Sequence, residues 1–228
     1  MADLAEARTT TSIIDWGLLP YLEAHSRQLA ALTSRIAGPS GDTVFLVEHP
    51  HVYTYGRGSN FAELQAKRPF DSDMRVELVQ VERGGGVTYH GPGQLVAYPI
   101  IDVRQKTGDL HRFLRWLEEV IIQTIAPWGL TGEHHPTHTG VWIEGRKIAS
   151  IGIAVRQWIS YHGLALNVST DLRYFGAIHP CGLSPEVMTS MEQLTGRTIA
   201  MEDVRKEFVR VLRTLRAGVA TEGMARRD

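Results

Sequence analysis

Cysteine and long apolar runs are both scarce in this sequence. Its 228 residues include one cysteine, Cys181, which cannot form a disulfide within the chain. A protein without disulfides suits a reducing compartment, and we expect it in the cytoplasm. No segment approaches the roughly 18–20 consecutive apolar residues of a membrane-spanning helix. The first residues also lack the basic-then-apolar order of a signal peptide, so we expect no membrane partner.

A large net charge is missing as well. The chain carries 25 acidic and 24 basic residues, which leaves a formal charge of −1. A nearly neutral chain has no global field to recruit nucleic acid, so we expect no nucleic-acid partner. Hydrophobic residues make up 43% and charged residues 21%, which is typical of a globular domain. We expect one domain over residues 1–228 and, since no large apolar surface is evident, a monomer.

Lysine is rare among the basic residues: 4 of the 24 are lysine and 20 are arginine. Lys147 starts an otherwise apolar segment, residues 147–156. Lysine can exchange a proton within reach of neutral pH, whereas arginine cannot. Lys147 is therefore a candidate for proton transfer or for stabilising a thiolate; the alternative is an exposed end of a strand.

Apolar periodicity predicts the secondary structure. Helices are expected over residues 18–36, 110–127 and 201–215, with Asp109 capping the second and a further helix opening at Ser184-Pro185-Glu186. Strands are expected over residues 43–47, 75–81, 94–103, 141–143, 147–156 and 159–169. Pro99 suggests that its strand is an edge or carries a bulge. The last three strands form a meander, so we predict an α/β domain with a mixed, largely antiparallel sheet flanked by helices.

The most unusual segment is Arg83-Gly-Gly-Gly-Val-Thr-Tyr-His-Gly-Pro-Gly-Gln94, with five glycines in twelve residues. Glycine lets a backbone approach a ligand closely and turn its N–H groups toward it. The segment is no phosphate-binding P-loop, because Pro92-Gly93 stands where lysine and serine or threonine are needed. The alternative is a turn between two strands.

Cys181 lies in Ala177-Ile-His-Pro-Cys-Gly-Leu183. A lone cysteine is most often a small buried apolar residue. Here Pro180 and Gly182 favour an irregular loop, where reactive groups tend to lie, and His179 is close enough in sequence to act as a base. Both interpretations stay open on chemistry alone.

Two further groups invite a functional interpretation. His134, His135 and His138 resemble a metal cluster, but Pro136 prevents a regular helix and only Glu133 adds a nearby carboxylate, so we expect no metal. The last helix is rich in basic residues, which suggests a solvated face or else a docking patch for an acidic partner. These residues are Arg205, Lys206, Arg210, Arg213 and Arg216.

Taken together and in this order, the motifs resemble the lipoyl(octanoyl) transferases. The matching segments span residues 48–182, and we expect the family core at about residues 43–215. They are Glu48-His-Pro-His-Val-Tyr-Thr, the segment Arg83 to Gln94, Gly145-Arg-Lys-Ile-Ala-Ser-Ile-Gly152, Tyr161-His-Gly-Leu-Ala-Leu-Asn-Val168 and Pro180-Cys-Gly182. The resemblance implies a catalytic domain like that of the biotin and lipoate protein ligases, with no cofactor.

The resemblance also implies the activity and its residues. An octanoyl or lipoyl group would pass from acyl carrier protein to Cys181 as a thioester, beside Lys147, and then to a lysine of a lipoyl domain. The expected acceptors are the lipoyl domains of 2-oxoacid dehydrogenases and the H protein of glycine cleavage. The expected substrate-binding residues are Arg83, Gly84, Gly85, Gly86, Val87, Thr88, Tyr89, His90, Ser150, Ile151, Gly152, Gly163, Leu164 and Ala165.

Three other functions compete with this one. An ATP-dependent lipoate or biotin ligase on the same fold would form an adenylate and need no covalent cysteine. A lipoyl amidotransferase would also use a cysteine, but would take its acyl group from a lipoylated protein. A non-catalytic domain would bind acyl carrier or lipoyl domains without becoming acylated on Cys181.

Overall fold

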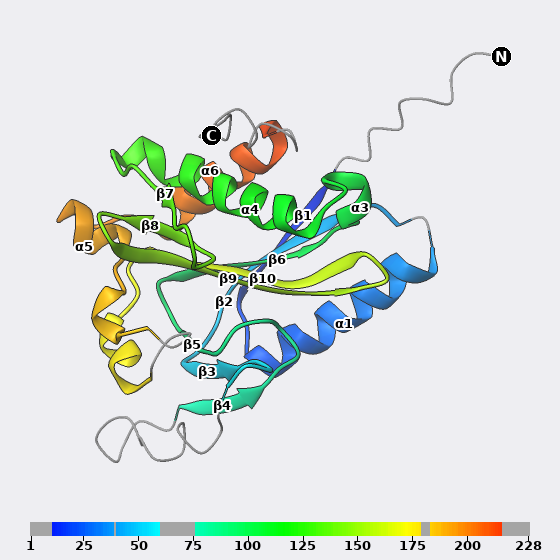
Figure 1. Cartoon of the computed structure of the whole chain (residues 1–228), viewed down its shortest axis with the longest axis horizontal. Helices are drawn as coiled ribbons and strands as arrows, with labels where there is room; N and C mark the ends of the chain where they lie inside the picture. Colours follow the sequence, from blue (N-terminus) through cyan, green and yellow to red (C-terminus); the bar gives the residue numbers. More distant parts are fainter. Residues whose placement is uncertain (1–10, 39, 60–75, 179–182, 216–228) are drawn as a thin grey trace, which may run out of the picture.

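The computed structural model describes residues 11–38, 40–59, 76–178 and 183–215. A seven-stranded sheet forms the centre, in the order β1-β2-β6-β10-β9-β8-β7, and a small sheet in the order β4-β3-β5 lies beside it (Figure 1). The large sheet contains β1 (Ser12–Leu18), β2 (Thr43–Glu48), β6 (Gln94–Ile100), β10 (Ile159–Asn167), β9 (Arg146–Arg156), β8 (Val141–Ile143) and β7 (Glu133–His134). The small sheet contains β4 (Glu77–Gln80), β3 (Val52–Tyr55) and β5 (Val87–His90).

Strand directions confirm the predicted fold class. In the large sheet β1 and β2 are parallel, and the other neighbouring pairs are antiparallel. In the small sheet β3 is parallel to β4 and antiparallel to β5. The meander of β8, β9 and β10 is also confirmed. Its β9–β10 turn places Gln157 and Trp158 at φ values of 49° and 68°, the left-handed conformation that matches the twist of a hairpin.

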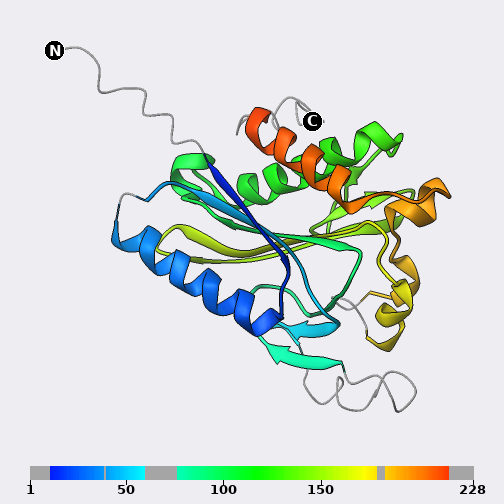
Figure 2. The same cartoon turned by 180° about the vertical axis from the view of Figure 1, so that it is seen from behind.

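Helices cover both faces of the large sheet. The helices α4 (Leu110–Ile125) and α6 (Met201–Thr214) lie on one face, and α1 (Tyr21–Ala37) lies on the other (Figures 1 and 2). Side chains alternate between the two layers along β6: Leu95 and Ala97 belong to the α4–α6 core, Val96 and Tyr98 to the α1 core. A strand buried on both faces is a rigid platform for a site.

The remaining helical segments are short. They are α3 (Val103–Lys106), α5 (Met191–Thr195) and three 3₁₀ turns at Ala126–Trp128, Leu172–Ala177 and Pro185–Val187. None of the helices within the described residues is both long and apolar enough to cross a membrane.

The capped helix α4 follows its sequence signal closely. The Asp109 carboxylate accepts a hydrogen bond from the Arg112 N–H at 2.9 Å, as predicted for an N-cap. The helix ends at Ile125, because Pro127 falls in the 3₁₀ turn that follows.

Several local expectations were wrong. Pro99 lies in β6, which has β2 and β10 as neighbours, so it marks no edge. The sheet tolerates this proline because the register of β6 with β10 ends at Ala97, before the missing N–H would be needed. Ser184-Pro185-Glu186 starts a single 3₁₀ turn, not a helix. Strands β1 and β5 were not expected, and α1 begins only after Pro20.

Candidate active site

A pocket opens where the small sheet meets the large one. It encloses about 470 Å³ of empty space, a volume that includes open solvent at its mouth. Its wall brings together three predicted substrate-binding stretches from distant parts of the sequence. The predicted residues in it are Arg83, Gly84, Gly85, Thr88, His90, Ser150, Ile151, Gly152, Gly163, Leu164 and Ala165.

Three other predicted binding residues lie outside that wall. Val87 and Tyr89 alternate with Thr88 and His90 along β5, so they point to the opposite face and pack in an aromatic cluster with Tyr174 and its neighbours. The carbonyl of Gly86 accepts a hydrogen bond from Arg83. A role for these three in binding substrate stays a prediction.

Two paired glycines let the backbone segments meet at the pocket. Gly152 on β9 is paired with Gly163 on β10. A Cβ at Gly163 would lie 1.9 Å from the Ala97 carbonyl oxygen, and a Cβ at Gly152 would lie 3.2 Å from the Gly84 carbonyl oxygen. The glycine-rich segment therefore approaches the sheet closely, and the Gly84 N–H donates to the Ile153 carbonyl at 3.2 Å.

Arg83 holds the glycine-rich segment in place. Its guanidinium donates to the Thr54 carbonyl oxygen at 2.8 Å and to the Thr54 hydroxyl at 2.9 Å. The same group donates to the carbonyl oxygens of Gly84 at 3.1 Å and Gly86 at 2.8 Å. This buried cation thus shapes the pocket wall by fixing the backbone that forms it.

A chain of buried hydrogen bonds leads away from the pocket. His90 Nδ1 donates to Gln94 Oε1 at 2.8 Å, since that oxygen can only accept. Gln94 Nε2 donates to Asn167 Oδ1 at 2.9 Å, and Asn167 Nδ2 donates to the Thr189 carbonyl at 2.9 Å. The Thr189 N–H then donates to the Lys147 carbonyl at 3.0 Å. We call His90, Gln94, Asn167 and Thr189 the polar chain.

Burial keeps the histidines beside the pocket neutral. It lowers the pKa of His49 to about 4 and that of His90 to about 3, and the neighbouring His49 lowers the latter further. His49 accordingly donates from Nδ1 to the Leu19 carbonyl and accepts at Nε2 from the Tyr98 hydroxyl, both at 2.7 Å. These neutral rings add no charge to the pocket, whose wall contains the buried cation of Arg83.

Lys147 is buried, which excludes the alternative that it lies at the exposed end of a strand. Its side chain is 4% exposed, and its ammonium lies 5.7 Å from the centre of the Trp142 ring. Gly140 packs against it so closely that a Cβ there would lie 2.7 Å from Lys147 Cε. The backbone of Lys147 also forms a β-bridge with that of Met188. Lys147 stands three residues before Ser150 on β9, so the strand links it to the pocket wall.

Glu118 anchors the segment that packs on Lys147. This buried carboxylate on α4 accepts the Gly140 N–H at Oε1, 2.9 Å away, and approaches His134 Nδ1 at 2.8 Å through Oε2. His135 instead stacks on Trp142. Among the described residues, His134, His135 and His138 do not converge into a metal-binding group.

Cys181 and His179 lie outside the described residues. The chain is described up to the buried Ile178 and again from Leu183. The nucleophile and its possible histidine base therefore stay predictions.

Four residues of the pocket wall were not among the predicted binding residues: Tyr21, Val96, Tyr98 and His162. Three of them come from segments predicted only as a helix or a strand. His162 had a usable signal, because it precedes Gly163 in one of the family motifs.

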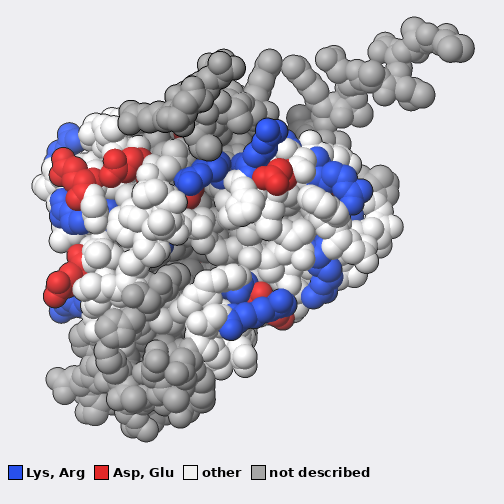
Figure 3. Space-filling view, in the orientation of Figure 1, with Lys and Arg blue, Asp and Glu red and all other residues white. Residues whose placement is uncertain are grey.

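Charges on the C-terminal helix α6 are largely paired. Arg205 reaches Glu48 at 2.8 Å and Asp15 at 3.2 Å, while Lys206 pairs with Glu202 within the helix. Basic and acidic side chains are interspersed on the face shown in Figure 3. These pairs favour a solvated face over a docking patch for an acidic partner.

These features define a class of protein: an α/β domain with a pocket on a mixed sheet and a buried lysine on a strand that contributes to the pocket wall. Solved structures share its fold. A bi-partite lipoate protein ligase from Thermoplasma acidophilum superposes with a TM-score of 0.67 at 15% identity, covering 89% of this chain and 82% of that one. The biotin protein ligase from Aquifex aeolicus gives a TM-score of 0.50 at 9% identity, covering 89% and 68%.

Sequence comparisons identify the family. The lipoyl protein ligase A/B catalytic domain model matches residues 20–213, and the chain belongs to this family. An octanoyltransferase from Nostoc punctiforme is 50% identical over 179 residues, 78% of this chain and 76% of that protein. Another from Rubrobacter xylanophilus is 47% identical over 195 residues, 85% and 87% of the two chains. The resemblance inferred from the motifs is thus confirmed.

Proposed function

We propose that this protein is an octanoyltransferase, a single catalytic domain that moves an octanoyl or lipoyl group from acyl carrier protein to a lysine of a lipoyl domain. The pocket carries the proposal, because its wall unites the stretches Arg83–Gly85, Ser150–Gly152 and Gly163–Ala165. The strand β9, which supplies Ser150–Gly152, also carries the buried Lys147. Similarity to octanoyltransferases over most of the chain supports the same reaction.

The reaction runs in two acyl transfers. The Cys181 thiolate attacks the carbonyl of octanoyl-acyl carrier protein and expels the carrier thiol, which leaves an octanoyl thioester on Cys181. The lysine amine of the acceptor then attacks this thioester and forms an amide. The first step exchanges one thioester for another and the second is downhill, so neither needs ATP.

Lys147 takes part in proton transfer or charge stabilisation in both steps. Either it takes the proton of the Cys181 thiol, or as an ammonium it stabilises the thiolate. The Lys147 ammonium then gives a proton to the departing carrier thiolate and becomes a neutral amine. In the second step this neutral amine accepts a proton from the incoming amine, which makes that amine nucleophilic. Backbone N–H groups of the glycine-rich segment supply hydrogen bonds to the oxyanion.

The pocket binds the acyl tail and selects its length. Ile151 and Leu164 line it from neighbouring strands and offer apolar contacts to a hydrocarbon tail. At about 0.8 kcal/mol for each buried CH₂ group, an octanoyl tail gains on the order of 5 kcal/mol. The paired glycines at positions 152 and 163 keep the floor free of side chains.

We propose the same partners and setting that the sequence suggests. The acceptors are the lipoyl domains of 2-oxoacid dehydrogenases and the H protein of glycine cleavage, and the donor is the acyl carrier protein. The enzyme acts as a cytoplasmic monomer without a cofactor.

Intact-protein mass spectrometry tests the proposal. The protein is mixed with octanoyl-acyl carrier protein without ATP, and we expect one octanoyl adduct that hydroxylamine removes and that Cys181→Ala lacks. Acylation of a lipoyl domain only with free octanoate and ATP would instead identify a ligase. Acyl transfer only from a lipoylated H protein would identify an amidotransferase, and a chain that is never acylated would be a binding domain.

A further inference from the structure

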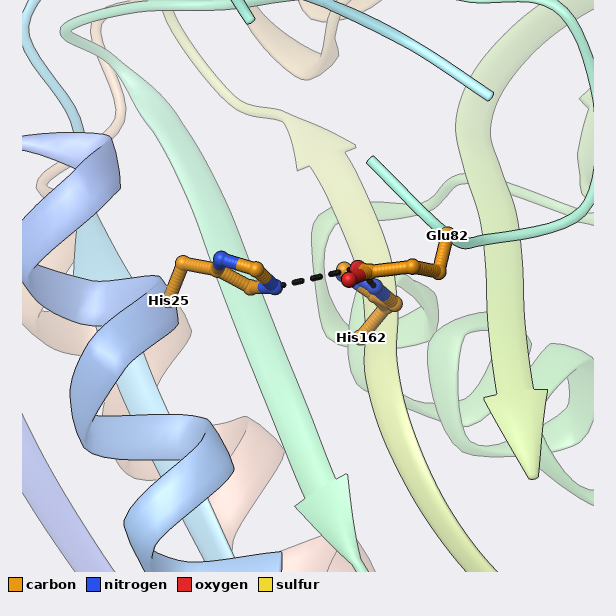
Figure 4. A group of neighbouring side chains, drawn as sticks. All are labelled: His25, Glu82 and His162. Carbon is orange, nitrogen blue, oxygen red and sulfur yellow. Dashed lines mark ion pairs between the residues drawn. The ribbon is translucent and has the colours of Figure 1, made fainter. Parts of the chain in front are cut away.

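Three ionisable side chains from separate elements converge at the pocket. His25 lies on α1, Glu82 between β4 and β5, and His162 on β10 (Figure 4). Glu82 Oε2 is 3.2 Å from His25 Nε2 and 3.5 Å from His162 Nε2. One ligand atom from each residue lies within 4.8 Å of the other two. We call these three residues the His-Glu-His group.

The group is close-packed but not hydrogen-bonded. Within the part of the chain that the structure describes, His25 Nε2, Glu82 Oε2 and both ring nitrogens of His162 are buried without a hydrogen-bond partner. His162 is 1% exposed. Glu82 forms an ion pair with either imidazole when that ring is protonated. With neutral rings these buried atoms stay unsatisfied, at a cost of about 1–3 kcal/mol, and a bound cation would satisfy them.

The backbone at His162 is held in an uncommon conformation. Its φ is +56°, in the left-handed region that non-glycine residues rarely adopt. The buried Gln28 side chain accepts the His162 N–H at 3.0 Å. Gln28 lies three residues after His25 on α1, so one helix face both fixes this backbone and presents the first imidazole. Strain kept at a pocket is typical of a functional position.

We propose that the His-Glu-His group binds a divalent first-row transition metal ion such as Zn²⁺. Two imidazoles and one carboxylate are ligands that Zn²⁺ favours, at about 2.0–2.2 Å each, which puts tetrahedral ligand atoms about 3.3 Å apart. The two separations between imidazole and carboxylate, 3.2 and 3.5 Å, match this spacing, and the ligand atoms of the two histidines lie within 4.8 Å of each other. Among the described residues this is the one group with such a ligand set.

The surroundings suit an ion that enters from solvent. The Glu82 side chain is 42% exposed, which gives the ion a path, while His162 lies in the pocket wall. His162 Nε2 is buried without a hydrogen-bond partner and lies 3.5 Å from Glu82 Oε2, so it is placed to act as a neutral imidazole ligand. Three protein ligands leave a fourth position for water or another small ligand.

Metal binding is tested in the Cys181→Ala protein, which removes the thiol as a competing ligand. Titration with Zn²⁺ is followed by calorimetry, and titration with Co²⁺ by its visible absorption. We expect one ion per chain, and at least a tenfold weaker affinity in His25→Ala and in Glu82→Gln. Glu82→Gln keeps the size of a partly exposed side chain, and thermal unfolding checks that each variant is folded.

The matched control is His135→Ala with His138→Ala, which removes two histidines from the other histidine-rich region. It should keep the full affinity. The proposal is overturned if no ion binds at 100 μM, if both single variants retain wild-type affinity, or if the control loses it. Because Cys181 is absent throughout, these outcomes are independent of octanoyl transfer.

Discussion

Two polar groups lie at the same pocket, and they differ in how their hydrogen bonds are satisfied. Within the polar chain, His90, Gln94 and Asn167 pass hydrogen bonds from one side chain to the next at 2.8–2.9 Å. In the His-Glu-His group the atoms are almost as close but make no hydrogen bond. The hydrogen bonds of the polar chain stabilise the fold, whereas the His-Glu-His group keeps buried polar atoms that a ligand can still satisfy.

The largest effect should come from Lys147, whose backbone ends the polar chain. Lys147→Arg keeps a cation but removes a usable base, so octanoyl transfer should fall at least about 100-fold in single-turnover assays. Lys106→Arg is the matched control, because Lys106 also lies over a tryptophan ring, 4.5 Å from Trp116. Full activity in Lys147→Arg would rule out proton transfer by this residue.

Breaking the polar chain should cost stability. Gln94→Leu leaves His90 Nδ1 and Asn167 Oδ1 buried without their partner, and we expect a loss of about 2–4 kcal/mol in the free energy of unfolding, measured with urea. Replacing the exposed Gln105 by leucine serves as the control. A loss under 0.5 kcal/mol would show that the chain is not a structural element.

The free energy of unfolding should fall in acid, because buried histidines in or beside both groups are neutral in the folded protein. Burial lowers the pKa of His49 to about 4, and those of His90 and His162 to about 3, from 6.5. The unfolded chain thus binds more protons below pH 6.5, so stability is fully present above that pH and falls as the pH drops toward 3.

Urea midpoints measured from pH 7.5 to 5 check this dependence. The loss is at most about 4 kcal/mol per pH unit for three histidines. His90→Gln should flatten the slope, whereas replacing the exposed His111 by glutamine should not. A stability that is constant over this range would contradict the neutral state of these rings.

The smallest effect is expected in the His-Glu-His group without metal. His25→Ala removes only the partly exposed ion pair with Glu82, so the free energy of unfolding should change by less than about 1 kcal/mol in a chelator. With Zn²⁺ added, only the parent protein should gain stability. An equal gain in His25→Ala would mean that the ion binds elsewhere.

Sequence patterns predicted the elements whose signals are local. The cap at Asp109 and the hairpins of β8, β9 and β10 depend on neighbours along the chain, and they form as expected. The sequence also pointed to most of the pocket wall, because the glycine-rich segment and the motifs around Ser150 and Gly163 are distinctive. Strand β5 escaped notice because its four residues follow three glycines.

The sequence by itself determined the fold class, the family and the candidate residues Lys147 and Arg83–His90, since these depend on composition and on motifs of consecutive residues. Only the tertiary structure decided which of them share a wall. The pleat of β5 directs His90 to the pocket and Tyr89 away from it. Sheet order placed Pro99 in a central strand, and the packing of α1 on β10 brought His25 to His162. Such contacts are set by long-range packing, which no local pattern encodes.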